Sequence, residues 1–228
     1  MTVMAGSLSI AEKTIAEDKI VLGEMILRLR MRGLGNREIL SALEKTPRRL
    51  FLRAEDHKVA YRDMWLPIEC GQTIHAPSTV AQMIDALSIS EEHRVLEVGT
   101  GSGYQAAILA QVAKSVFSIE RYRTLIELAE QRLRTLKIEN VHVRLGDGLL
   151  GFPEKAPFDR IIISGSVPFI PTHLLDQVKF GGVMVAAVGE QGGVQELRRI
   201  ERTGSRFIED KIANVRFVHM QGGIAEIM

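Results

Sequence analysis

The first third of the chain carries a helical pattern of apolar residues, followed by a stretch without any period. Apolar side chains recur mostly at helical spacing over residues 10–32, and Gly33 ends the pattern. A second helix is predicted over residues 36–45, with Asn36 as its cap. Prolines and glycines then interrupt residues 46–80. A long irregular stretch in a compact chain is usually functional, so we expect a substrate lid there.

After residue 90 the pattern changes to short apolar runs that alternate with amphipathic segments. This alternation with short loops predicts an α/β fold with a doubly wound, Rossmann-like parallel sheet that binds ligands at the carboxyl ends of its strands. Strands are predicted at Arg94–Val98, Ser115–Glu120, Val141–Leu145, Phe158–Ile163 and Gly182–Val188, with helices at Tyr104–Ala113, Arg121–Lys137 and Thr172–Val178.

The two ends of the chain differ in their expected structure. Two alternating runs, residues 195–201 and 214–220, are separated by a Gly-Ser pair and predict a C-terminal antiparallel hairpin on the sheet edge. The first nine residues are weakly patterned and predict a loose terminus. We therefore expect one structural unit with an N-terminal helical and lid extension, residues 1–80, and a core, residues 81–228.

Composition excludes several classes of function. Hydrophobic residues make up 46% and charged residues 25% of the 228, as in ordinary globular proteins. A net charge of +1 gives no electrostatic reason to bind nucleic acid or an anionic membrane. One cysteine and scattered histidines predict no metal site. With neither a membrane-length apolar run nor a secretory signal, the expected location is cytoplasmic.

A glycine-rich loop follows the first core strand. Gly99, Gly101 and Gly103 lie between a strand and a helix, where the absence of Cβ atoms lets a ligand approach the backbone. The spacing from Gly101 to Ala106 also fits a dinucleotide fingerprint. Glu97 disfavours an anionic pyrophosphate, whereas S-adenosylmethionine (AdoMet) carries an amino group and a sulfonium. AdoMet is therefore favoured over a dinucleotide and over a tight turn without a ligand.

Two further acidic residues end core strands. Glu120 closes the second strand, where it could accept hydrogen bonds from both ribose hydroxyls of either cofactor. Asp147 and Gly148 follow the third strand and could hold the adenine amino group beside a flat ring. The expected AdoMet contacts in the core are Glu97, Gly99, Thr100, Gly101, Ser102, Gly103, Glu120, Arg121, Asp147 and Gly148.

The end of the fourth strand helps to identify the methyl acceptor, because it lies beside the transferred methyl group. Residues 163–168 read Ile-Ser-Gly-Ser-Val-Pro and contain no Asn/Asp-Pro-Pro-aromatic motif for a base amine. Cys70 follows a glutamate and not a proline, so a pyrimidine C5 nucleophile is not indicated. No acidic cluster suggests a Mg²⁺-dependent catechol site. Base-modifying and metal-assisted methyl transfer are therefore disfavoured.

From about residue 44 to 217 the chain resembles the protein-L-isoaspartate (D-aspartate) O-methyltransferases. The glycine loop is common to many methyltransferases, whereas the Leu-Pro-Ile, Gly-Gln-Thr-Ile and Ala-Pro segments within residues 66–77 are specific to this family. The resemblance implies a core of the AdoMet-dependent methyltransferase type that methylates the carboxyl group of isoaspartyl residues in damaged proteins and so starts their repair. It implies transient protein or peptide substrates and no metal, nucleic acid or membrane.

The resemblance also implies that Thr73, Ile74, His75 and Ala76 close on the sulfonium and the acceptor carboxylate. The family has its active-site serine where this chain has His75. A carboxyl acceptor is ionised at pH 7, so alignment, and not a general base, is the task of the protein. A histidine N–H can orient a carboxylate as a serine hydroxyl does. The larger ring could also fill the acceptor pocket.

Three hypotheses follow for this position. His75 can replace serine as the catalytic donor that positions the carboxylate, with activity that changes as pH crosses the histidine pKa. Alternatively, the same fold methylates a different carboxylate or a small molecule. The third hypothesis is an AdoMet-binding protein without catalysis. The residues do not decide between them.

Overall fold

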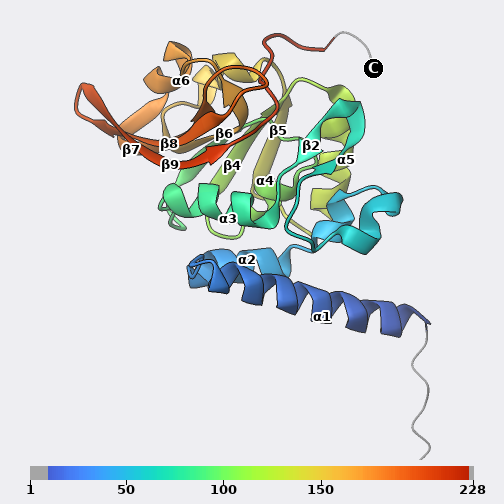
Figure 1. Cartoon of the computed structure of the whole chain (residues 1–228). Coiled ribbons are helices and arrows are strands. Elements are labelled where there is room, and N and C mark those ends of the chain that lie inside the picture. The colour runs from blue at the N-terminus through green and yellow to red at the C-terminus, as the bar shows by residue number, and fades with distance from the viewer. Residues whose placement is uncertain (1–9, 226–228) are drawn as a thin grey trace, which may run out of the picture.

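The computed structural model describes residues 10–225, so the predicted loose terminus over the first nine residues lies outside the described part. A seven-stranded sheet with the order β5-β4-β3-β6-β7-β8-β9 forms the centre (Figure 1). The strands from β5 to β7 run parallel, and β8 and β9 are antiparallel to their neighbours. The bounds are β3 Arg94–Val98, β4 Ser115–Glu120, β5 Val141–Leu145, β6 Phe158–Val167, β7 Val178–Val188, β8 Gln195–Thr203 and β9 Arg206–Val215.

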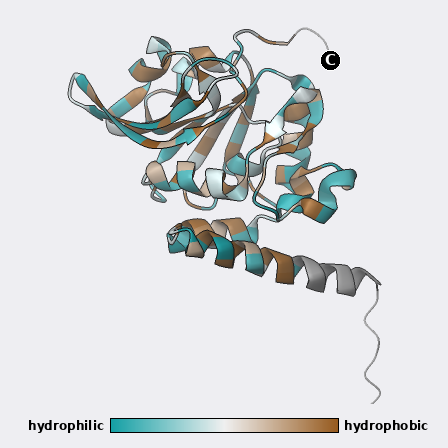
Figure 2. Ribbon diagram, in the orientation of Figure 1, coloured by the Kyte–Doolittle hydropathy of each residue, from teal (hydrophilic) through white to brown (hydrophobic). Residues whose placement is uncertain are grey.

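Helices cover both faces of this sheet, which confirms the predicted doubly wound α/β fold. Val95 packs into the core with α3 (Pro77–Ala86), α4 (Tyr104–Leu109) and α5 (Arg123–Thr135). Its neighbour Leu96 faces the opposite core, which contains α6 (Thr172–Asp176). Because both faces are buried, the central strands read as continuous apolar runs, which Figure 2 shows as brown segments between the helices.

The N-terminal helices match the prediction closely. They are α1 (Ile10–Met31) and α2 (Arg37–Lys45), and α1 lies on the side of α2 that faces away from the sheet (Figure 1). The Asn36 side chain accepts hydrogen bonds from the backbone N–H groups of Glu38 and Ile39 at 3.1 and 3.3 Å, as expected of an N-cap. No helix within residues 10–225 is both long and apolar enough to cross a membrane.

The irregular stretch over residues 46–80 contains more structure than its sequence suggests. A short antiparallel pair joins β1 (Leu66–Pro67) to β2 (Thr73–Ile74). Helix α3 already begins at Pro77, so the predicted division of the chain after residue 80 falls within a helix and stays a prediction. The remaining turns are the 3-10 helices η1 Arg48–Phe51, η2 Ala54–Val59 and η3 Glu69–Gly71 here, and η4 Gly148–Leu150 and η5 Pro153–Lys155 later in the chain.

The predicted hairpin forms, but its second strand was placed wrongly. Strand β9 covers Arg206–Val215, not residues 214–220. It is an edge strand that is largely exposed and pairs charges with β8, as between Lys211 and Glu196 at 2.9 Å. Such a strand buries no alternating apolar face, so its sequence carries no period-2 signal. Other elements also differ from their predicted bounds: α4, α5 and α6 are shorter than predicted, and β6 and β7 are longer.

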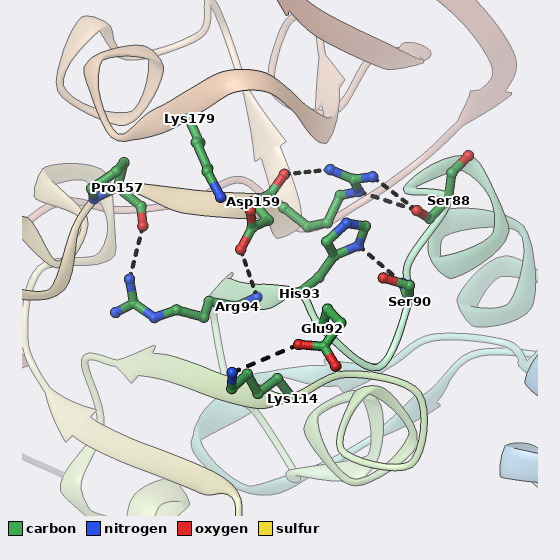
Figure 3. A network of polar contacts seen from close by, with 10 residues as sticks. Ser88, Ser90, Glu92, His93, Arg94, Lys114, Pro157, Asp159 and Lys179 are labelled. Atoms are coloured by element: carbon green, nitrogen blue, oxygen red, sulfur yellow. Dashed lines mark hydrogen bonds and ion pairs between the residues drawn. The ribbon is translucent and has the colours of Figure 1, made fainter.

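A polar cluster joins the amino ends of the central strands, opposite the carboxyl ends where ligands are expected (Figure 3). The Asp159 carboxylate accepts the backbone N–H of Arg94 at 2.9 Å and pairs with Lys179 at 2.7 Å. The Arg94 guanidinium donates to the Pro157 carbonyl at 3.0 Å. These contacts join the starts of β3, β6 and β7, so we assign this cluster to the stability of the sheet.

Candidate active site

A pocket of about 880 Å³, open to solvent, lies at the carboxyl ends of β3, β4 and β6. Strands β3 and β6 are adjacent but not consecutive, and such a switch point is where open α/β sheets bind ligands. The lining residues are Gln72, Thr73, Ile74, His75, Val80, Gly99, Thr100, Gly101, Ser102, Tyr104, Gln105, Ile119, Glu120, Arg121, Tyr122, Gly148, Ser164, Val218, His219, Met220 and Gln221.

The glycine loop needs its glycines for conformation and packing. Gly99, Gly101 and Gly103 have φ values of 93°, 53° and 86°, which other residues adopt only with strain. A Cβ atom on Gly103 would lie 3.0 Å from the Cβ atom of Ala129 in α5. Gly103 therefore lets α5 pack against the loop, while Gly99 and Gly101 line the pocket.

Glu120 holds the glycine loop as well as lining the pocket. One carboxylate oxygen accepts the N–H of Gly101 at 2.9 Å. The other accepts the N–H groups of Arg121 and Tyr122 at 2.8 and 3.1 Å. Burial raises the pKa of Glu120, and these backbone hydrogen bonds oppose the rise. The sequence predicted a ribose acceptor at this position but not its role in shaping the loop.

Glu97, a predicted cofactor contact, lies behind the pocket and does not line it. The side chain is fully buried, and it accepts hydrogen bonds from Ser118 Oγ at 2.5 Å and Gln105 Nε2 at 3.3 Å. Burial raises the pKa of Glu97 to about 8, although these two hydrogen bonds act to lower it. Gln105 lies between Glu97 and the pocket, so Glu97 orients Gln105, and a direct contact with the cofactor stays a prediction.

Three other predicted contacts, Ala76, Gly103 and Asp147, are also absent from the lining. Asp147 is engaged by backbone groups, because it accepts the N–H of Leu149 at 2.9 Å and that of Gly223 at 2.7 Å. The second bond ties it to the C-terminal segment. The predicted contacts that do meet in the pocket are Thr73, Ile74, His75, Gly99, Thr100, Gly101, Ser102, Glu120, Arg121 and Gly148.

The C-terminal segment that follows β9 forms a wall of the pocket with Val218, His219, Met220 and Gln221, whereas a strand was predicted over residues 214–220. It runs alongside β6, since Ser166 N–H donates to Val218 O at 2.9 Å and Met220 N–H donates to Ser166 O at 2.8 Å. A Cβ atom on Gly165 would overlap the Met220 sulfur at 2.5 Å, so this glycine makes room for Met220. Gln221 accepts a hydrogen bond from Arg121 at 2.6 Å.

Several of the missed lining residues had a sequence signal. Tyr104 and Gln105 directly follow the glycine loop, and Ser164 follows the predicted fourth strand. Residues next to a cofactor loop are good candidates on position alone. The contribution of residues 218–221 had no such local signal, because it depends on where the chain returns after the hairpin.

His75 lines the pocket with its ring stacked on Phe217, the two ring centroids being 4.2 Å apart and the planes 27° apart. Burial, and next the charge of Arg48, lower the pKa of His75 to about 4. The ring forms no hydrogen bond to the backbone of residues 10–225 or to the described side chains, residues 19–225. It is thus a neutral imidazole at physiological pH, and the change of activity across the histidine pKa that the sequence analysis considered is not supported.

Comparison with known proteins decides the family. The family model described as "Protein-L-isoaspartate(D-aspartate) O-methyltransferase (PCMT)" matches residues 22–225. The chain belongs to this family. The protein-L-isoaspartate O-methyltransferases of Parvibaculum lavamentivorans and Maricaulis maris are 49% and 45% identical to it, over 89% and 90% of this chain and 92% and 96% of theirs. The resemblance stated from the motifs is confirmed.

Solved structures show the same fold. A protein-L-isoaspartate O-methyltransferase superposes with a TM-score of 0.81 at 27% identity, over 88% of this chain and 66% of that one. A putative protein-L-isoaspartate O-methyltransferase from Plasmodium falciparum, solved with S-adenosyl-L-homocysteine, superposes with a TM-score of 0.74 at 22% identity, over 87% and 97%. Among the described side chains, residues 19–225, no group of three or more His, Cys, Asp or Glu is placed to hold a metal.

Proposed function

We propose that this protein transfers the methyl group of AdoMet to the carboxylate of L-isoaspartyl and D-aspartyl residues in damaged proteins, which begins their repair. The observation that carries the proposal is that the glycine loop, Glu120 and the Thr73–His75 segment line one pocket in a chain of this family. Transient encounters with flexible polypeptide segments and a cytoplasmic location belong to the same proposal.

The pocket has the chemistry that AdoMet requires. The Oε1 atom of Gln105 is a buried acceptor without a hydrogen-bond partner, and it suits the amino group of the cofactor. Glu120 suits the ribose hydroxyls, and Gly148 leaves room for a flat ring. When bound, AdoMet supplies an electrophilic methyl group on a sulfonium. The P. falciparum structure, which contains the demethylated product, supports this choice of cofactor.

The acceptor side needs orientation and no general base. An isoaspartyl α-carboxyl group is ionised at pH 7 and is already nucleophilic. The neutral ring of His75 can donate one N–H to a carboxylate oxygen and leave the other oxygen free to attack the methyl carbon. Stacking on Phe217 fixes the plane of that ring. By family resemblance, a backbone amide nitrogen then attacks the methyl ester and expels methanol, which gives a succinimide that water can reopen to aspartate.

The direct test is methyl transfer from labelled AdoMet to an isoaspartyl peptide, with the matched aspartyl peptide as control. We expect label on the isoaspartyl peptide alone. If neither peptide is labelled although calorimetry shows AdoMet binding, the protein has kept the cofactor but either uses another carboxylate or small molecule or binds AdoMet without catalysis. If calorimetry shows no AdoMet binding either, the proposal fails as a whole.

A second prediction concerns His75 itself. We expect kcat to stay flat between pH 5.5 and 8.5, because a pKa of about 4 leaves the ring neutral throughout this range. His75→Ala should lower kcat about 10- to 100-fold, since a hydrogen bond to a charged group contributes about 1.5–3 kcal/mol. His75→Ser should retain most of the activity by restoring a small donor.

The control for these variants is His173→Ala, which removes an exposed imidazole on α6. A profile that rises or falls with an apparent pKa between 6 and 7 in the wild type, but not in His75→Ser, would show that His75 does titrate during turnover. Equal activity of wild type and His75→Ala would remove this residue from the reaction.

A further inference from the structure

Arg48 is a fully buried cation that the proposed reaction does not yet use. It lies in η1 with 0% exposure, and it does not line the pocket. Among the described side chains, residues 19–225, no carboxylate forms an ion pair with it, although the charge of Asp63 favours the charged form of Arg48. A buried charge with no ion-pair partner is expensive, so it persists only where other polar groups compensate it.

The compensation comes from backbone carbonyls of two separate segments. One terminal nitrogen of the guanidinium, Nη1, donates to the carbonyls of Ala60 at 2.7 Å and Arg62 at 3.4 Å. The other, Nη2, donates to Met64 at 2.9 Å and to His75 at 3.0 Å. The planar fork of an arginine can bridge such positions, whereas a lysine ammonium is a single point.

The bridged segments meet at the acceptor side of the pocket. Met64 and His75 share one nitrogen of Arg48, and their chain neighbours pair in the small sheet, with Leu66 opposite Ile74. The 60–64 segment is also tied to α3, since Asp63 accepts the N–H of Ser78 at 2.9 Å. The backbone of His75 is therefore fixed by the hydrogen bond from Arg48 to its carbonyl, while its ring is fixed by stacking on Phe217.

We infer that Arg48 is a positioning residue for the acceptor carboxylate, because its guanidinium joins the 60–64 segment to the backbone of His75 and so sets where the imidazole N–H points. This inference rests on the proposed function. Arg48 forms no hydrogen bond with Glu120 or the glycine loop, and it acts on Tyr104, the residue after that loop, through its charge. We therefore expect its loss to affect the adenosine part of the cofactor site much less than the acceptor side.

The test compares Arg48→Lys and Arg48→Met with wild type, and Arg37→Met, which removes an exposed cation on α2, is the control. We expect Arg48→Lys to fold, to lower kcat/KM for the peptide at least tenfold, and to change the AdoMet dissociation constant less than threefold. Amide hydrogen exchange should accelerate over residues 60–76 and stay unchanged over β5. Arg48→Met should exceed Arg48→Lys in each effect, provided that it folds.

Two outcomes would overturn the inference. One is an Arg48→Lys protein with wild-type kcat/KM for the peptide and wild-type exchange over residues 60–76. The other is an equal loss of peptide and AdoMet affinity together with faster exchange over the whole chain, which would indicate general destabilisation. If the wild type itself fails to methylate isoaspartyl peptides, the proposed function fails, and hydrogen exchange still decides whether Arg48 holds the segment.

Discussion

Replacing Glu120 by glutamine should weaken AdoMet binding about 100-fold, because hydrogen bonds to a charged group contribute about 1.5–3 kcal/mol each and two ribose hydroxyls are involved. A glutamine has one acceptor oxygen, and its amide nitrogen would face an N–H donor of the loop or of Arg121 and Tyr122. The variant thus weakens the ribose contact and loosens the Gly101 turn together. Isothermal titration calorimetry measures the change directly.

The matched control is Glu127→Gln, which removes the same charge from an exposed position on α5. It should bind AdoMet as the wild type does. A Glu120→Gln protein that is folded by circular dichroism and binds AdoMet within threefold of wild type would show that the ribose lies elsewhere. Loss of folding in this variant would call for Glu120→Asp, which keeps the charge but shortens the reach.

Glu97→Gln should remove a pH dependence from the stability of the cofactor-free protein. Glu97 has a pKa of about 8 when folded and an ordinary value of 4.5. The folded state therefore keeps a proton that the unfolded chain releases, so the contribution of Glu97 to stability declines as pH rises from about 5 to 8. The slope for one such group is about 1.4 kcal/mol per pH unit, which amounts to a few kcal/mol over this range.

Glutamine can satisfy the same partners. Its oxygen can accept the Ser118 hydroxyl. Its nitrogen would face Gln105 Nε2, so the Gln105 amide must rotate to present its Oε1 atom, which has no partner now. The free energy of unfolding, measured by urea titration at pH 5, 6, 7 and 8, should diverge between wild type and variant. Relative to the wild type, the variant should become more stable as the pH rises. The exposed Glu91→Gln is the control. Parallel curves for wild type and Glu97→Gln would show that Glu97 is ionised in the fold.

The central strands, the α2 cap and the glycine loop were predictable because their signals are local. Buried parallel strands are continuous apolar runs, and Asn36 caps the helix that begins beside it. The family motifs added the Thr73–His75 segment, whose place at the pocket no periodicity shows. The second strand of the hairpin was misplaced, because an exposed edge strand has no buried face to mark it.

The sequence by itself determined the α/β class, the cofactor loop and the residues that end each core strand, since these follow from patterns within a few positions. Only the tertiary structure decided that residues 218–221 wall the pocket, that Phe217 stacks on His75, and that Arg48 holds the backbone of His75. These contacts join segments far apart in the chain. Burial then lowers the pKa of His75 and raises that of Glu97, and burial is a property of the packed molecule that no local pattern carries.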